Sequence, residues 1–258
     1  MPEYEVYAIK YAHHARRASE NFIGGDPHDG PMPLDYFVWL IRGAGREIVV
    51  DTGFSAAMAA KRGRDHIRCP TEGLRLLGTD AKAVPHVVIT HLHYDHVGNF
   101  DLFPAATLHL QDLEMRYATG RHMGEERHRY AYEVEEVVGV VRRVYQNRVR
   151  FHDGDAGIAP GVSLHLIGGH TMGLQAVRVE TRRGPVVLAS DASHFYANIE
   201  QTRPFPIVWS VADMVEGYRR LRDLAGSVER IIPGHDPLVL ERYPAPAAEM
   251  GGIVARLD

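Results

Sequence analysis

The sequence is organised around one stretch of nine residues, His91-Leu92-His93-Tyr94-Asp95-His96-Val97-Gly98-Asn99. An apolar segment at residues 86–90 precedes it and predicts a strand. In extended backbone, side chains two positions apart point the same way, so His91 and His93 could bind one ion together. Asp95 and His96 follow the strand and could turn toward a second ion. Imidazoles and carboxylates suit zinc and similar metals, so the stretch predicts a metal site rather than a histidine-rich surface loop.

The composition excludes several classes of function. The 258 residues carry 29 basic and 33 acidic side chains, and no basic block predicts nucleic-acid binding or a polybasic membrane contact. The first residues lack a signal-peptide pattern, and no apolar stretch is long enough to span a bilayer. The single cysteine, Cys69, excludes an intrachain disulfide and fits a reducing compartment. We therefore expect a cytoplasmic protein without nucleic-acid or membrane partners.

Apolar patterning along the chain predicts alternating strands and helices within a single domain, residues 1–258. Between the first two strands, residues 13–33 are rich in glycine and proline, which predicts a long loop that could cover a substrate pocket. Residues 111–147 predict a helical insertion, which could support a homodimer. We expect strands at residues 3–11, 34–42, 47–50, 86–90, 105–110, 162–167, 174–181, 185–190 and 228–232.

The clearest amphipathic helix follows Ser210. The hydroxyl of Ser210 suits an N-cap, Asp213 completes a start that resembles a capping box, and Gly226 predicts the end of the helix. The apolar residues recur at helical spacing and predict one buried face. This face consists of Val211, Met214, Val215, Tyr218, Leu221 and Leu224.

Four of the predicted strands end in residues that can bind metals. His91 follows residues 86–90, and three further strands precede the other candidates. In layered α/β proteins, binding sites gather outside the carboxyl ends of strands. A lone Gly-His pair is more often a turn than a ligand, but four such strand ends together are poorly explained by coincidence. The three downstream candidates are His170 after residues 162–167, Asp191 after 185–190 and His235 after 228–232.

These residues resemble the metallo-β-lactamase superfamily. The resemblance covers His-x-His-x-Asp-His at 91–96, Gly-His at 169–170 and 234–235, Asp191, and the Asp51-Thr52-Gly53 turn. It implies a four-layer αβ/βα sandwich with the site at one edge of the sheets. It further implies that one metal is held by His91, His93 and His170, that a second is held by Asp95, His96 and His235, and that Asp191 bridges the two.

Within this superfamily, the chain is most similar to the N-acyl-homoserine lactonases. The similarity lies in Gly169-His170-Thr171-Met172-Gly173-Leu174-Gln175, in Asp191-Ala192-Ser193 and in Gly234-His235-Asp236. One position departs from the pattern, because those lactonases place a tyrosine after Asp-Ala-Ser that assists the substrate. Here His194 occupies that position and Tyr196 follows two residues later, so either side chain could take the role.

The resemblance implies a dinuclear hydrolase that opens a lactone or related ester and acts in quorum quenching. Two divalent ions, zinc first with iron or manganese as alternatives, would supply a bridging hydroxide near neutral pH, and that hydroxide would attack the carbonyl. Asp191 would set the metal spacing, Asp95 would shuttle the proton, and His194 or Tyr196 would donate to the oxyanion. Alternatives are a glyoxalase-like thioesterase, which shares the seven ligands but resembles longer chains, and a di-iron oxidoreductase, which needs an electron-donor domain.

Overall fold

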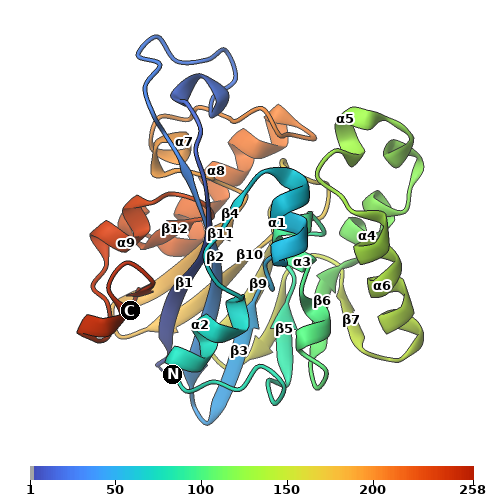
Figure 1. The fold of residues 1–258 in the computed structure, drawn as a ribbon, viewed down its shortest axis with the longest axis vertical. Coiled ribbons are helices and arrows are strands. Elements are labelled where there is room, and N and C mark those ends of the chain that lie inside the picture. Colours follow the sequence, from blue (N-terminus) through green and yellow to red (C-terminus); the bar gives the residue numbers. More distant parts are fainter. Residues whose placement is uncertain (1–2) are drawn as a thin grey trace.

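The computed structural model describes residues 3–258, in which two β-sheets pack face to face between layers of helices (Figure 1). The larger sheet contains β1 (Glu5–His14), β2 (Leu34–Gly43), β3 (Arg46–Val50), β4 (Asp65–His66), β5 (His86–Val88), β6 (Thr107–Gln111), β7 (Val149–His152) and β13 (Val254–Arg256). The smaller sheet contains β8 (Ala156–Ala159), β9 (Val162–Leu166), β10 (Gln175–Thr181), β11 (Gly184–Ser190) and β12 (Ile231–Pro233).

The helices lie between and after these strands. They are α1 (Ala56–Arg62), α2 (Pro70–Leu76), α3 (Tyr94–Val97), α4 (Asp112–Ala118), α5 (Glu126–Arg129), α6 (Val134–Tyr145), α7 (Tyr196–Glu200), α8 (Val211–Ala225) and α9 (Leu238–Arg242). Short 3₁₀ turns lie at η1 (Ala18–Glu20), η2 (Phe100–Leu102), η3 (Arg121–Gly124), η4 (Val228–Arg230) and η5 (Ala248–Met250). None of the helices within residues 3–258 is long and apolar enough to cross a membrane.

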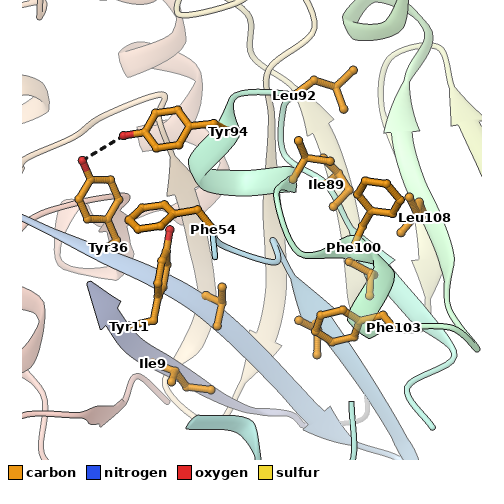
Figure 2. Packing of buried hydrophobic residues seen from close by; sticks show 14 of the residues in the cluster. Ile9, Tyr11, Tyr36, Phe54, Ile89, Leu92, Tyr94, Phe100, Phe103 and Leu108 are labelled. Atoms are coloured by element: carbon orange, nitrogen blue, oxygen red, sulfur yellow. Dashed lines mark hydrogen bonds between the residues drawn. The ribbon is translucent and has the colours of Figure 1, made fainter. Parts of the chain in front are cut away.

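Three buried apolar clusters separate the layers. One fills the space between the two sheets and includes Trp39 and Val177. A second lies between the larger sheet and helices α1 to α4 and α6, and Figure 2 shows part of it around Phe54 and Phe100. A third lies between the smaller sheet and α8. The order helices, sheet, sheet, helices confirms the predicted four-layer αβ/βα sandwich.

Parallel pairing brings the functional strand ends to one edge. Strands β3, β5, β6 and β7 are parallel neighbours, with α1 and α2 crossing between β3 and β5. In the smaller sheet β11 and β12 are also parallel. Because the carboxyl ends of parallel strands lie on the same side, the chain after β5 and the chain after β12 can meet there.

Helix α8 follows the prediction at its ends but not across its whole apolar face. The Oγ atom of Ser210 accepts a hydrogen bond from the backbone N–H of Asp213, and Gly226 ends the helix at φ 65°. Met214, Tyr218 and Leu221 are buried, as predicted. Val211 and Val215 are wrong predictions, because the smaller sheet covers only a narrow face of the helix and leaves them 46% and 38% exposed.

Three other segments differ in detail from the expectation. Strand β1 extends to His14, so the loop predicted at residues 13–33 begins after that residue. Residues 228–232 begin as the 3₁₀ turn η4, so the strand before His235 is only Ile231–Pro233. Residues 111–147 hold α4, η3, α5 and α6, with Val137 and Val140 buried against the larger sheet. Its description as an insertion and its role in a dimer remain predictions.

A row of three histidines crosses neighbouring strands of the larger sheet. Nδ1 of His86 lies 3.1 Å from Nε2 of His109, and Nδ1 of His109 lies 3.0 Å from Nε2 of His152. Each comes from a different strand, and the ring of His109 is fully covered. Burial, reinforced by the two neighbouring imidazoles, lowers the pKa of His109 to about 3.

This row should make the protein less stable in acid. The unfolded chain takes up a proton on His109 near pH 6.5, whereas the folded chain resists it down to about pH 3, so the free energy of unfolding falls as the pH drops between these values. The slope contributed by one such group is up to about 1.4 kcal/mol per pH unit. In urea unfolding at pH 4 to 8, His109→Gln is expected to flatten this dependence, while His28→Gln, in an exposed loop, should not. Parallel pH profiles for wild type and His109→Gln would contradict this interpretation.

Candidate metal centre

Three histidines from two loops form the first group of candidate ligands. The Nε2 atom of His91 lies 3.0 Å from Nδ1 of His93, and Nε2 of His170 lies 2.9 Å from that same atom. His91 follows β5, and His170 follows β9 through the tight Gly168-Gly169 turn, in which both glycines have positive φ. All three rings are buried, so the three nitrogens face one another away from water.

The second group combines two histidines with two carboxylates. Asp95 and His96 lie on the short helix α3, and His235 follows β12. The Nε2 atom of His96 lies 3.5 Å from Oδ2 of Asp95, and the Nε2 atom of His235 lies 3.7 Å from it. Asp191 completes this buried group.

Asp191 lies between the two groups and presents one oxygen to each. Its Oδ2 atom is 3.3 Å from Nε2 of His170 and 3.9 Å from Nε2 of His91. Its Oδ1 atom is 3.0 Å from Nε2 of His235 and 3.2 Å from Nε2 of His96. The seven residues singled out in the sequence therefore meet at one place, with a single carboxylate joining the two sets.

Hydrogen bonds outside the cluster turn the histidine lone pairs inward. The Nδ1 atom of His96 lies 2.7 Å from Oδ2 of Asp51, the residue of the early Asp-Thr-Gly turn. His170 Nδ1 donates to the carbonyl of Ile207 (2.7 Å), and His235 Nδ1 donates to the carbonyl of Asp35 (3.0 Å). Because each Nδ1 is occupied in this way, the Nε2 lone pairs point at the centre, as metal-binding imidazoles require.

The donor set fits divalent cations. Buried Nε2 of His96 and Oδ1 of Asp191 have no hydrogen-bond partner among residues 3–258, although buried polar atoms normally have one. Burial, followed by the neighbouring imidazoles, lowers the pKa of His91 and His93, which keeps both rings neutral as ligands must be. Nitrogens bound to a tetrahedral zinc lie about 3.3 Å apart, close to the spacing found here.

In the second ligand group, the carboxylates and the imidazoles shift each other's pKa values. Burial alone would lower the pKa of His96, but Asp191, Asp95 and Asp51 outweigh it and raise that pKa well above its usual value, so a cation that binds there would displace a proton from this ring. Burial opposes ionisation of Asp191, but the surrounding imidazoles, His235 and His96 first, hold its pKa well below the usual range. The anionic charge of the two aspartates is therefore available for a cation.

A model of the metallo-beta-lactamase superfamily matches residues 32–235, which include all seven of these residues. The chain belongs to this superfamily. An N-acyl homoserine lactonase of a Bacillus species is 30% identical over 133 residues, 51% of this chain and 48% of that protein. The alignment thus spans about half the length of the curated relative.

Solved structures of the superfamily show the same fold. A quorum-quenching N-acyl homoserine lactone lactonase superposes with a TM-score of 0.75 over 90% of this chain and 92% of its own, at 22% identity. A dizinc quorum-quenching lactonase, solved with the product N-hexanoyl-L-homoserine, superposes with a TM-score of 0.70 over 90% and 87%, at 15% identity. At these identities the likeness concerns the fold.

His194 lies in the site beside Asp191. The ring of His194 stacks on Phe205, with centroids 3.6 Å apart, and its Nε2 atom lies 2.9 Å from Oδ2 of Asp191. Burial lowers the pKa of His194 to about 3, so the ring is neutral at pH 7. A neutral ring that donates from Nε2 to Asp191 orients that carboxylate, and its buried Nδ1 has no hydrogen-bond partner among residues 3–258. The catalytic role of His194 stays a prediction.

Tyr196 does not reach the site. It begins helix α7, and its ring packs in the apolar cluster between the sheets with the guanidinium of Arg242 3.7 Å from the ring centroid. Its hydroxyl is buried there without a hydrogen-bond partner. Tyr196 lies two residues after His194, and its side chain points into the core. Its hydroxyl therefore cannot contact a substrate at the metal cluster.

A cavity of about 270 Å³ opens over the cluster and contains side chains that the sequence analysis missed. Asp95, Asp191, His194 and His235 line its floor. Tyr36 and Tyr94 line its wall, and their hydroxyl oxygens are 3.4 Å apart. Figure 2 shows these two hydroxyls facing each other. Tyr94 lies inside the motif at residues 91–96, and this position in the sequence could have marked it as a residue of the site. Residues at the start of segment 13–33 also line the cavity, and Figure 1 shows this segment, in blue, projecting beyond the sheets.

Glu114, also missed, braces the loops that carry His93 and His170. The carboxylate is fully buried on α4 and accepts four hydrogen bonds. Oε1 accepts from the backbone N–H of Leu92 and from the hydroxyl of Tyr132, at 2.9 and 2.8 Å. Oε2 accepts from the hydroxyl of Thr171 and from the backbone N–H of Gly173, at 2.6 and 3.1 Å. One carboxylate thereby fixes the distance between the two ligand loops.

Removing this brace should be costly. Glu114→Ala leaves four buried donors without an acceptor and is expected to lower the free energy of unfolding by about 3 kcal/mol or more. The measurement is urea unfolding of the metal-replete protein, together with its metal content. Glu135→Ala, on the exposed face of α6, is the control and should change little. Equal free energies of unfolding for the two variants would show that the hydrogen bonds of Glu114 do not stabilise the fold.

Proposed function

We propose that the protein is a dinuclear metal-dependent hydrolase that opens a lactone ring. The observation that carries the proposal is the position of Asp191, with one oxygen at 3.3 Å from His170 and the other at 3.0 Å from His235. A carboxylate so placed can hold two cations at a fixed separation. Membership of the superfamily and the lactonase relatives supply the reaction class.

In this proposal each ligand group holds one cation. His91, His93 and His170 hold the first. Asp95, His96 and His235 hold the second, and Asp191 contacts both. Zinc is the first choice because the ligands are imidazoles and carboxylates. When bound, the two cations would supply Lewis acidity and a hydroxide nucleophile near neutral pH.

The remaining side chains of the site orient groups and move protons. His194 donates to Oδ2 of Asp191 and fixes the plane of that carboxylate. Asp95 lines the cavity, and its carboxylate can pass a proton to the departing alkoxide. The hydroxyl of Tyr94 accepts a hydrogen bond from Nε of Arg64 at 3.1 Å and lies 3.4 Å from the hydroxyl of Tyr36. When Tyr36 donates in that pair, the hydrogen of Tyr94 can turn to a substrate oxygen. Tyr94 thus replaces Tyr196 as the donor that we propose.

The test is proton release from a panel of lactones that vary in ring size and acyl chain, beginning with N-acyl homoserine lactones. We expect hydrolysis by the metal-replete protein, loss of hydrolysis after chelation, and recovery when zinc is restored. Hydrolysis of thioesters without any lactone activity would contradict the proposal and favour a glyoxalase-like thioesterase.

A further inference from the structure

One wall of the cavity carries two guanidinium groups, and the proposed hydrolysis uses only the Nε atom of one of them. Arg16 and Arg64 both line the cavity that contains Asp95, Asp191 and His235. Arg16 lies between β1 and η1, and Arg64 lies between α1 and β4, so two separate segments bring these guanidinium groups to the same space. Lactone opening at the metal cluster uses Nε of Arg64 through Tyr94 and leaves Arg16 and the Nη2 atom of Arg64 without a role.

Arg64 is a half-buried cation without an anionic partner. Its Nε donates to the hydroxyl of Tyr94 and its Nη1 to the carbonyl of Arg62, at 3.1 and 2.8 Å. Within residues 3–258 no carboxylate oxygen lies within 4 Å of the Arg64 guanidinium, and Nη2 makes no hydrogen bond. Its neighbour Arg62 is by contrast paired with Glu133 at 2.7 Å. Partial burial of an unpaired charge is unfavourable, so this arrangement indicates a partner that comes from outside the chain.

The surroundings of Arg64 do not neutralise it. Among residues 3–258, the only carboxylate that lines the cavity besides Asp95 and Asp191 is Glu20. Glu20 is half-exposed, lies 3.8 Å from Nε of Arg16, and accepts a hydrogen bond from the backbone N–H of Arg17 at 2.8 Å. His14 also lines this wall, and burial followed by the charges of Arg64 and Arg16 lowers its pKa to about 4, so it is neutral at pH 7. Two guanidinium groups thus face one carboxylate.

We infer that this wall binds an anionic group of the substrate, a carboxylate or a chemically similar oxyanion, through Arg64 with support from Arg16. Planar oxyanions match the guanidinium fork, and the charge-assisted bonds are stronger than neutral ones. Because the wall and the metal cluster line one cavity of about 270 Å³, a small lactone can present its carbonyl to the cluster and its anionic group to Arg64. This inference rests on the proposed lactone hydrolysis and narrows its substrate class to lactones that carry an acidic substituent.

The experiment compares two lactones of the same shape. 5-Oxotetrahydrofuran-2-carboxylate carries the anion, and 5-oxotetrahydrofuran-2-carboxamide is its neutral counterpart. For the wild type we expect a higher kcat/KM for the carboxylate. Arg64→Gln should reduce the ratio of the two kcat/KM values about tenfold to a hundredfold, mainly through KM, since one charge-assisted contact is lost. Arg64→Lys should restore part of the ratio.

The control is Arg219→Gln on the exposed face of α8, which removes the same charge far from the cavity and should leave the ratio unchanged. An unchanged ratio in Arg64→Gln, with normal metal content and melting temperature, would overturn the inference. If neither lactone is hydrolysed, the lactone panel above decides the proposed function, and the anion site is tested apart from the reaction by calorimetry with tetrahydrofuran-2-carboxylate, which has no carbonyl in its ring. Binding that Arg64→Gln weakens would support the site, and equal binding by both proteins would reject it.

Discussion

Replacement of Asp191 with asparagine is expected to lower kcat/KM for lactones at least about a hundredfold and to reduce the bound metal to fewer than two ions per chain. Asparagine keeps the shape of the side chain but removes the charge that faces both ligand groups. Its amide nitrogen would also point a donor at either His170 or His235, whose Nε2 atoms lie 3.3 and 3.0 Å away. Initial rates and elemental analysis of the same preparation measure the two effects together.

A matched control separates this effect from loss of an acidic residue. Asp101 is 82% exposed, and its ion-pair partner within residues 3–258 is Arg143, so Asp101→Asn should leave both rate and metal content unchanged. Surface ion pairs of this kind contribute little to stability. Full turnover by Asp191→Asn would refute the role of Asp191 as the link between the two groups.

Removal of the metals is expected to abolish hydrolysis and to lower the melting temperature by about 10 °C or more. Without cations, the carboxylates of Asp95 and Asp191 and the neighbouring imidazoles remain buried together with unsatisfied atoms. An ion present at a thousand times its dissociation constant stabilises the folded chain by about 4 kcal/mol. For a chain of this size, each kcal/mol shifts the melting temperature by about 2–4 °C.

Calorimetry of the same sample before chelation, after chelation and after readdition of zinc measures this shift. A variant that already lacks part of the ligand set, Asp191→Asn, should show a smaller shift, because fewer ions leave. Equal melting temperatures with and without metal would mean that the buried cluster is stable without cations. That result would contradict the prediction that bound cations stabilise the folded chain.

The candidate ligands could be picked out from the sequence because each lies within a few residues of the end of a strand or within one short motif. Asp191 follows β11 and His235 follows β12 within two residues, so local apolar patterning already marks their positions. The four-layer fold followed from the resemblance of these motifs, in this order, to the metallo-β-lactamase superfamily. The location of these residues at strand ends depends on the apolar residues immediately before them in the sequence.

The residues that the sequence did not reveal act across long separations. Glu114 bonds to Gly173, 59 residues away, and nothing near Glu114 distinguishes it from other acidic residues on a helix. Tyr196 was assigned to the site because it follows His194 closely, yet the start of α7 turns it into the core. Likewise, Val211 and Val215 have the spacing of a buried face, but the sheet beneath α8 does not extend under them.

The most direct test of the account is anomalous diffraction from crystals of the zinc-loaded protein, recorded on both sides of the zinc absorption edge. We predict two peaks about 3.5–4 Å apart, one among His91, His93 and His170 and the other among Asp95, His96 and His235, with one oxygen of Asp191 at each. A single peak in zinc-saturated crystals, or two peaks of which Asp191 touches only one, would contradict it.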